Sequence, residues 1–201
     1  RSPITQTHGN SEDMPDIGAL LSPASVAVVG ASPDSGILRG RIMHVLGCHP
    51  YKGRVYPVSR SHDEIMGLKA YRTVSDLPEA VDLAVLIIPA AFVPDTLEAC
   101  GERGVRAAQI ITSGFAEEVD GAGEDLQKQV RDIAEKYDMA VCGPNSEGFA
   151  NMAADFCPTF SPAVDDPNTP LLPKWRKDGK IGVVAQSGGM GFAFYDRGRP
   201  K

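Results

Sequence analysis

The stretch Ser25–Gly36, SVAVVGASPDSG, decides the fold class of this chain. A short apolar run rich in β-branched residues ends at Gly30, a loop of small residues follows, and an amphipathic run begins at Gly36. This pattern predicts a strand, a tight loop and a helix. We expect such a junction to bind phosphate, because the first turn of a helix has N–H groups without partners and the helix dipole adds positive charge.

The residue types in this loop suit a close approach by a ligand. Gly30 and Gly36 have no side chain to obstruct it, and Ser32 and Ser35 offer hydroxyl donors. Ser35 is also expected to cap the helix. The alternative is an ordinary turn between a strand and a helix, in which glycine is needed for steric reasons alone.

Further apolar runs predict an alternating α/β chain. The expected additional strands are Arg54–Val58, Asp82–Ile88, Arg106–Thr112 and Met139–Cys142. Helical spacing predicts a short helix at 17–21, a helix from 36 that Gly47 ends, and helices at 93–100 and 126–137. Five strands alternating with helices predict a Rossmann-like, doubly wound parallel sheet, in which ligands bind at the C-terminal ends of the strands. The loops expected at that edge are 31–35, 59–62, 89–91, 113–115 and 144–147.

The sequence before and after these elements predicts where the domain begins and ends. Residues 1–15 are polar and aperiodic and are expected to form a disordered tail before a domain at 16–157. Residues 158–179 include five prolines between Pro158 and Pro173 and are expected to be a linker. A second domain is expected to start at 180–201 with a strand at 181–185. Because one strand and one helix cannot bury their own apolar face, we expect this second domain to be truncated and the chain to be part of a longer protein.

The composition argues against several classes of protein. The chain has 201 residues, 42% of them hydrophobic, and a formal net charge of -6, which argues against a nucleic-acid or membrane-surface role. No apolar run approaches the length of a membrane span. The four cysteines lack a C-x-x-C pair, so we expect no metal site and instead reduced core thiols in a cytosolic protein. They are Cys48, Cys100, Cys142 and Cys157.

The end of the second predicted strand points to a phosphorylated ligand. The first loop lacks G-x-G-x-x-G, and the position where an NAD site places an acidic residue holds Ser59 and Arg60. An arginine there can pair with a phosphate on the ribose, which suits either NADP or the 3′-phosphate of coenzyme A. The alternative is that Arg60 is a solvated loop charge.

A second small-residue loop, Gln186-Ser187-Gly188-Gly189, precedes another predicted helix. It resembles a nucleophile elbow, but all four histidines precede Ser187, which argues against a hydrolase. The loop is therefore interpreted as a second phosphate cradle. Glu147 is a candidate general base, although a carboxylate in the first turn of a helix is commonly there to complement the dipole. His44 and His62 are expected to be surface residues.

Six blocks, in order and spacing, carry a resemblance to a known family. They are Ser25–Ser32, Gly53–Val58, Asp82–Pro89, Ser113–Ala116, Gly143–Asn145 and Gln186–Gly188. They resemble the nucleoside-diphosphate-forming (ADP-forming) acyl-CoA synthetases, which are similar to the alpha subunit of succinyl-CoA synthetase. The match covers about 17–195 and corresponds to the N-terminal part of the family's chain.

The resemblance implies a CoA-binding domain followed by the start of a flavodoxin-like ligase domain. Members of the family make acyl-CoA from a carboxylic acid, CoA and ATP through an acyl phosphate and a phosphohistidine. No histidine here matches the phosphorylated one, which lies downstream in the family, so this chain is expected to bind CoA and to catalyse nothing. ATP, ADP and magnesium are expected only on an ATP-grasp domain or subunit, and the protein is expected to be a homo-oligomer.

The same resemblance implies roles for individual residues. Residues expected to contact CoA are Gly30, Ala31, Ser32, Pro33, Asp34, Ser35, Gly36, Pro57, Ser59, Arg60, Pro89, Ser113, Gly114 and Asn145. Those expected to hold the phosphate of the acyl phosphate or phosphohistidine are Gln186, Ser187, Gly188 and Gly189. Many members have Cys after Gly-Pro-Asn, whereas this chain has Ser146-Glu147, a variant associated with a feruloyl-CoA synthetase-like branch.

Two other functions stay open from the sequence. The same N-terminal domain also occurs fused to acetyltransferases that modify protein lysines, where it senses CoA or a nucleotide. An NADP-binding oxidoreductase domain is the third possibility, weakened by the absent glycine fingerprint and by the lack of a hydride-transfer site.

Overall fold

The computed structural model describes residues 15–119, 121, 123–164 and 181–198. The expected tail therefore lies almost entirely outside the described residues, as do positions 165–179 of the expected linker. None of the helices in the described ranges is both long enough and apolar enough to cross a bilayer.

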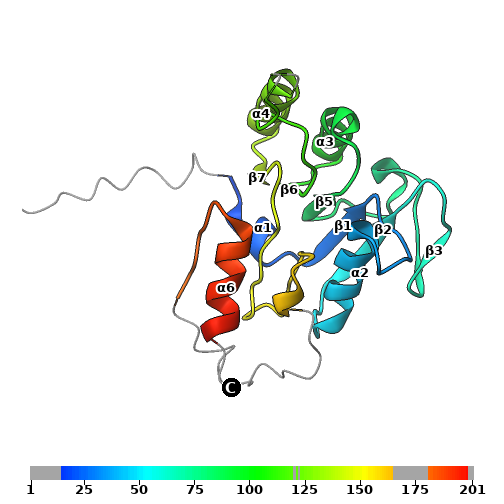
Figure 1. Cartoon of the computed structure of the whole chain (residues 1–201). Helices are drawn as coiled ribbons and strands as arrows, with labels where there is room; N and C mark the ends of the chain where they lie inside the picture. The colour runs from blue at the N-terminus through cyan, green and yellow to red at the C-terminus, as the bar shows by residue number, and fades with distance from the viewer. Residues whose placement is uncertain (1–14, 120, 122, 165–180, 199–201) are drawn as a thin grey trace, which may run out of the picture.

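Five parallel strands form the sheet at the centre of the molecule (Figure 1). They are β1 Ser25–Val29, β2 Arg54–Val58, β5 Leu83–Leu86, β6 Ala107–Ile110 and β7 Ala140–Cys142. Their order in the sheet is β2-β1-β5-β6-β7, so the chain reverses direction across the sheet between β2 and β5. The predicted parallel α/β sheet is confirmed, and its switch point lies between β1 and β5, where a doubly wound sheet binds its ligand.

Helices cover both faces of this sheet. They are α1 Ile17–Leu21, α2 Leu38–Cys48, α3 Val93–Glu102 and α4 Glu124–Lys136. A further helix, α6 Gly188–Gly198, packs against the segment around Val164 instead. Figure 1 shows α3 and α4 together on one side of the sheet and α2 on the other. The short 3-10 helices are η1 Val74–Asp76, η2 Ala90–Phe92 and η3 Pro162–Val164.

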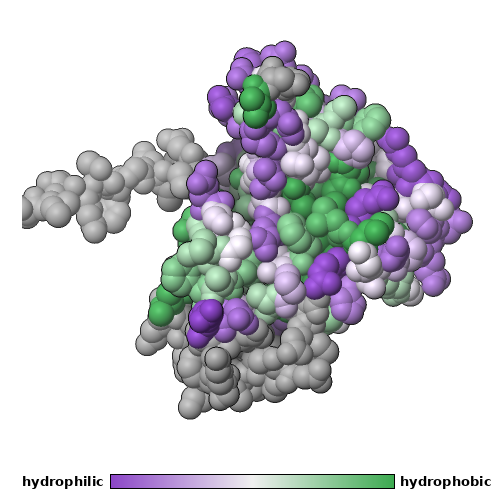
Figure 2. Space-filling model, viewed as in Figure 1, coloured by the Kyte–Doolittle hydropathy of each residue, from purple (hydrophilic) through white to green (hydrophobic). Residues whose placement is uncertain are grey.

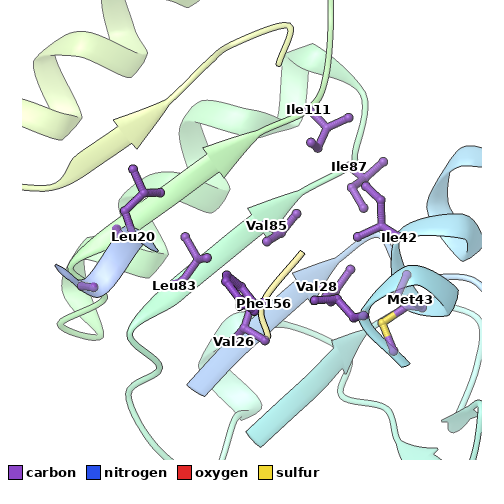
Figure 3. Close-up of a cluster of buried hydrophobic side chains, with 14 of the residues drawn as sticks. Leu20, Val26, Val28, Ile42, Met43, Leu83, Val85, Ile87, Ile111 and Phe156 are labelled. Carbon is purple, nitrogen blue, oxygen red and sulfur yellow. The ribbon is translucent and has the colours of Figure 1, made fainter. Parts of the chain in front are cut away.

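The central strands are buried on both faces because their residues are apolar at every position. In β1, Val26 and Val28 face the cluster beneath α1 and α2, while Ala27 and Val29 face the cluster beneath α3 and α4. Figure 3 shows the first cluster, with Phe156 among the strand residues. This double burial is the reason that the run reads as continuously apolar rather than alternating.

Some helix boundaries differ from the expectation. Gly47 does not end α2, which continues to Cys48 and has His49 as its C-cap. Ser35 does not cap the helix, because α2 begins at Leu38 with Ile37 as an N-cap that provides no side-chain hydrogen bond. Glu147 lies outside any helix, so the complement to a dipole of its own helix does not apply.

The C-terminal part departs most from the expectation. Residues 181–185 form no strand, and Ile181 and Val184 are 89% and 102% exposed. Within the described residues no neighbouring strand lies beside them, and an isolated strand has no hydrogen-bond partner. Residues 158–164 pack onto the first domain rather than leaving it, since Thr159 and Val164 are buried.

A short antiparallel hairpin was not predicted from the sequence. It consists of β3 Glu64–Ile65 and β4 Leu68–Lys69. After it, Tyr71 pairs beside the end of β2, where its N–H donates to the Pro57 carbonyl at 2.9 Å and its carbonyl accepts from the Ser59 N–H at 2.8 Å. The hairpin thereby returns the chain to the edge at which a ligand is expected.

Candidate functional site

A cavity of about 550 Å³ opens where β1, β2 and β5 end. Val29, Val58 and Ile88 give it an apolar floor, and residues from α2 and α3 form its sides. Figure 2 shows a hydrophobic area, rimmed by hydrophilic residues, between the positions of α2 and α3. A volume of this size is typical of sites for small organic ligands and cofactors.

The structure brings some of the predicted residues together and separates others from this cavity. The predicted residues that line it are Gly30, Ala31, Ser32, Ser59, Arg60 and Pro89. The predicted residues that do not line it are Pro33, Asp34, Ser35, Gly36, Pro57, Ser113, Gly114 and Asn145.

Gly30 is required where the first loop leaves β1. Its φ is +92°, and an added Cβ would lie 2.3 Å from the Ile87 carbonyl oxygen, so no side chain fits. The N–H groups of Gly30 and Ala31 both donate to the Val58 carbonyl, at 2.9 and 3.2 Å. These two amides are therefore used within the sheet, so the amides left for a ligand at this junction are those of the first turn of α2.

Polar residues within the loop hold its shape. The Ser32 hydroxyl accepts from the Asp34 N–H at 3.3 Å, and the Asp34 carboxylate accepts from the Gly36 N–H at 2.9 Å. Gly40 lets the loop pass against α2, because an added Cβ there would lie 1.9 Å from the Asp34 carbonyl oxygen. Sequence reasoning missed Gly40, although a glycine inside a helix is a signal of close packing.

The loop after β2 forms the opposite wall. Ser59 is buried, and its hydroxyl lies 3.2 Å from His62 Nδ1. The Arg60 guanidinium lies over the Phe92 ring, 5.4 Å from its centroid. Phe92 was missed from the sequence, because nothing in a single apolar residue after a strand shows that it is 47% exposed beside a cavity.

Arg72 braces this wall. One guanidinium nitrogen donates to the Arg60 carbonyl at 2.8 Å, and the other forms an ion pair with Asp63. Thr73 and Asp76 then form a capping box that fixes the start of η1. Sequence reasoning missed Arg72, since the hairpin that carries it to the cavity has strands of only two residues.

The charged residues that line the cavity are mainly cations. Arg39, Arg60 and Arg72 are cationic, and Asp95 is the acidic residue beside them. This is a local excess of positive charge in a chain of net charge -6. Guanidinium groups beside an apolar floor and an exposed aromatic ring suit a ligand that carries several phosphates and a heteroaromatic ring.

The predicted residues after β6 and β7 lie farther along the same sheet edge. The Gly114 N–H donates to the Glu117 carboxylate at 2.7 Å. Burial opposes ionisation of Glu117, but the hydrogen bonds from the N–H groups of Glu117, Gly114 and Phe115 lower its pKa below the ordinary value. The Asn145 N–H donates to the Thr112 carbonyl at 2.9 Å.

The loop Gln186–Gly189 lies apart from the cavity and leads into α6. Ser187 caps this helix, because its hydroxyl accepts from the Met190 N–H at 3.4 Å and its carbonyl accepts from the Gly191 N–H at 3.1 Å. An added Cβ at Gly188 would lie 2.4 Å from the Glu147 carboxylate. The loop from β7 thus packs against the start of α6. The residues that the structure describes contain no cluster of acidic, histidine and cysteine side chains able to hold a metal ion.

Curated relatives resemble most of this chain. It is 38% identical over 179 residues to the alpha subunit of acetate–CoA ligase (ADP-forming) I from Pyrococcus furiosus, a match that covers 87% of this chain and 36% of that protein. It is 38% identical over 177 residues to a trans-feruloyl-CoA synthase from an unidentified prokaryote, covering 87% of this chain and 24% of that protein. The chain thus spans about a third or less of these two relatives.

A solved structure of an acetyl-coenzyme A synthetase also resembles most of this chain. The chain aligns with a TM-score of 0.72 and 37% identity to the dinucleotide-forming acetyl-coenzyme A synthetase 1 of Candidatus Korarchaeum cryptofilum in complex with phosphate and ADP. The alignment covers 89% of this chain and 36% of that one.

The family model described as a CoA binding domain matches residues 24–152, which include all five strands and every residue that lines the cavity. The chain belongs to this family of CoA-binding domains.

Proposed function

We propose that this chain is the CoA-binding part of an ADP-forming acyl-CoA synthetase and that the cavity at the ends of β1, β2 and β5 holds CoA. The observation that supports this most is the grouping of Arg39, Arg60 and Arg72 around one apolar cavity at the switch point of the sheet. CoA carries a 3′-phosphate, a pyrophosphate and an adenine, which match the guanidinium groups and the exposed ring of Phe92.

The proposed orientation follows from the two walls. The nucleotide end lies between Arg60 and Phe92, where the ring stacks with adenine and the guanidinium pairs with the 3′-phosphate. The pyrophosphate lies near Arg39 and the first turn of α2. The pantetheine arm then follows the sheet edge past Pro89 toward Ser113, Gly114 and Asn145.

The acyl chemistry is proposed to need parts outside this chain. By resemblance to the family, the Gln186–Gly189 loop would hold a phosphate at the start of α6, and an ATP-grasp domain or subunit would supply ATP. The substrate is a carboxylic acid, and the relatives include an acetate–CoA ligase subunit and a trans-feruloyl-CoA synthase.

The test is calorimetric titration of the chain with CoA, dephospho-CoA and NADPH. We expect micromolar binding of CoA, weaker binding of dephospho-CoA because a charge-assisted contact is lost, and no binding of NADPH. A preference for NADPH would overturn the proposal in favour of an oxidoreductase domain. If the chain binds none of the three, the proposal that its cavity holds CoA without further domains is contradicted.

A further inference from the structure

A second cavity, of about 480 Å³, lies at the other end of α2. The C-terminal half of α2 forms one side, Gly53 and Val55 form another, and Met66 and Leu68 of the hairpin complete it. Among the described residues that line it, none is Lys, Arg, Asp or Glu. It therefore lacks the counter-charges that the first cavity offers to phosphates, and it suits an uncharged, apolar ligand.

A nucleophile and a base meet in this second cavity. Cys48 Sγ lies 3.5 Å from Nε2 of His44, one helical turn earlier on α2, and both residues line the cavity. The thiolate is the reactive form of cysteine, and an imidazole within hydrogen-bond reach can accept the thiol proton. Cys48 is partly exposed, whereas Cys100 and Cys157 are buried.

Two further titratable side chains, Tyr51 and His49, line the second cavity in the described part of the chain. Burial raises the pKa of Tyr51 to about 12, so its hydroxyl stays neutral. His49 Nε2 lies 2.8 Å from the Val164 carbonyl and donates to it.

We propose that Cys48 and His44 form a modification site for small, uncharged α,β-unsaturated carbonyl compounds. His44 Nε2 takes the thiol proton, and the sulfur attacks the β-carbon to form a C–S bond. The electron pair of the C=C bond moves to the carbonyl oxygen as an enolate, and the proton returns from the imidazolium to the α-carbon. The product is a thioether, and the step needs no oxidant, reductant or leaving group.

The experiment measures the alkylation rate of each cysteine by N-ethylmaleimide, using mass spectrometry of peptides from the natively folded chain. At pH 7 we expect Cys48 to react at least about tenfold faster than Cys142, the other partly exposed cysteine. His44→Gln should slow Cys48 by about tenfold and leave Cys142 unchanged. The matched control, His62→Gln, lies outside the second cavity and should change neither rate.

Each part of the proposal has a result that overturns it. Equal rates at Cys48 and Cys142, or an unchanged Cys48 rate in His44→Gln, would remove the nucleophile and base assignment. A maleimide that carries a sulfonate should lose selectivity for Cys48 over Cys142, and retained selectivity would show that the cavity does not discriminate. His44 is exposed, so its substitution should leave the fold intact, which circular dichroism checks.

Discussion

In the proposed CoA site, Arg60 is the residue expected to distinguish CoA from dephospho-CoA. Its guanidinium rests on the Phe92 ring and is otherwise exposed, an interaction that contributes only about 0.5–1 kcal/mol at an exposed site. The guanidinium can therefore leave the ring for a phosphate at little cost. A charge-assisted hydrogen bond to that phosphate contributes more, about 1.5–3 kcal/mol.

The first prediction concerns this residue. Arg60→Ala should weaken CoA binding by about 1.5–3 kcal/mol and should weaken dephospho-CoA binding by less, because only CoA carries the 3′-phosphate. Calorimetric titration of both ligands with both proteins measures the difference. An equal loss for the two ligands would contradict a contact between Arg60 and the 3′-phosphate.

At the scale of elements, the β3–β4 hairpin shapes the wall of the cavity. No residue of β3 or β4 lines this cavity, but the hairpin returns the chain so that Tyr71 pairs with the end of β2. Arg72 then reaches back to the carbonyl of Arg60 and the carboxylate of Asp63. One guanidinium thereby fixes the loop that presents Arg60, which a lysine cannot do because it lacks the planar fork.

The second prediction separates this bracing from simple charge. Arg72→Lys keeps the cation but loses the two-pronged contact, so CoA affinity should fall about five- to tenfold, nearly as far as in Arg72→Ala. Arg54→Ala is the control, because Arg54 of the edge strand β2 pairs with Glu79 and does not line the cavity. Affinity retained in Arg72→Lys and lost in Arg72→Ala would assign Arg72 a purely electrostatic role.

At the scale of the whole molecule, the two ends of the parallel strands differ in structure. The cavity opens at the C-terminal ends of β1, β2 and β5. At the N-terminal ends of the strands, Asp82 forms hydrogen bonds that link neighbouring strands. Its carboxylate accepts from the N–H groups of Ala24 and Ser25, at 2.7 and 3.2 Å, and from Arg106 at 2.6 Å. Strands β1, β5 and β6 are thus joined at the end opposite the cavity.

The third prediction follows from the ionisation of Asp82. Burial alone would raise its pKa, but the hydrogen bonds from Arg106, Ala24 and Ser25 and the charge of Arg106 lower it below the ordinary value. Since the pKa is about 4 in an unfolded chain, this stabilisation is complete above about pH 5 and is lost as the pH falls toward the folded value. Asp82→Asn should lower the free energy of unfolding by about 1–3 kcal/mol at pH 7.

Urea unfolding from pH 7 to pH 3 measures this effect. The difference between wild type and Asp82→Asn should shrink as the pH falls, because the wild-type carboxylate becomes protonated. Asp132→Asn is the control, since its ion pair with Lys128 is exposed and should contribute less than about 1 kcal/mol. A wild-type advantage over Asp82→Asn that stays constant down to pH 3 would contradict the assignment.

The sequence by itself determined the five strands, their alternation with helices and the family. These follow from local patterns: β-branched runs such as Val26–Val29 are buried on both faces, and the motif blocks keep their order. It also predicted that the loops of Gly30, Ser59 and Arg60 lie together, because parallel strands place their C-terminal loops at one edge, and these three residues line one cavity.

Only the tertiary structure decided which of those loops line the cavity. The order β2-β1-β5-β6-β7 groups the loops after β2, β1 and β5, and it leaves Ser113 and Asn145 farther along the edge. Arg39, Arg72 and Phe92 join the site through packing that no local periodicity records, and residues 181–185 lack a strand because pairing needs a neighbour. Strand order and pairing are properties of contacts between distant residues, so the local pattern of the chain does not contain them.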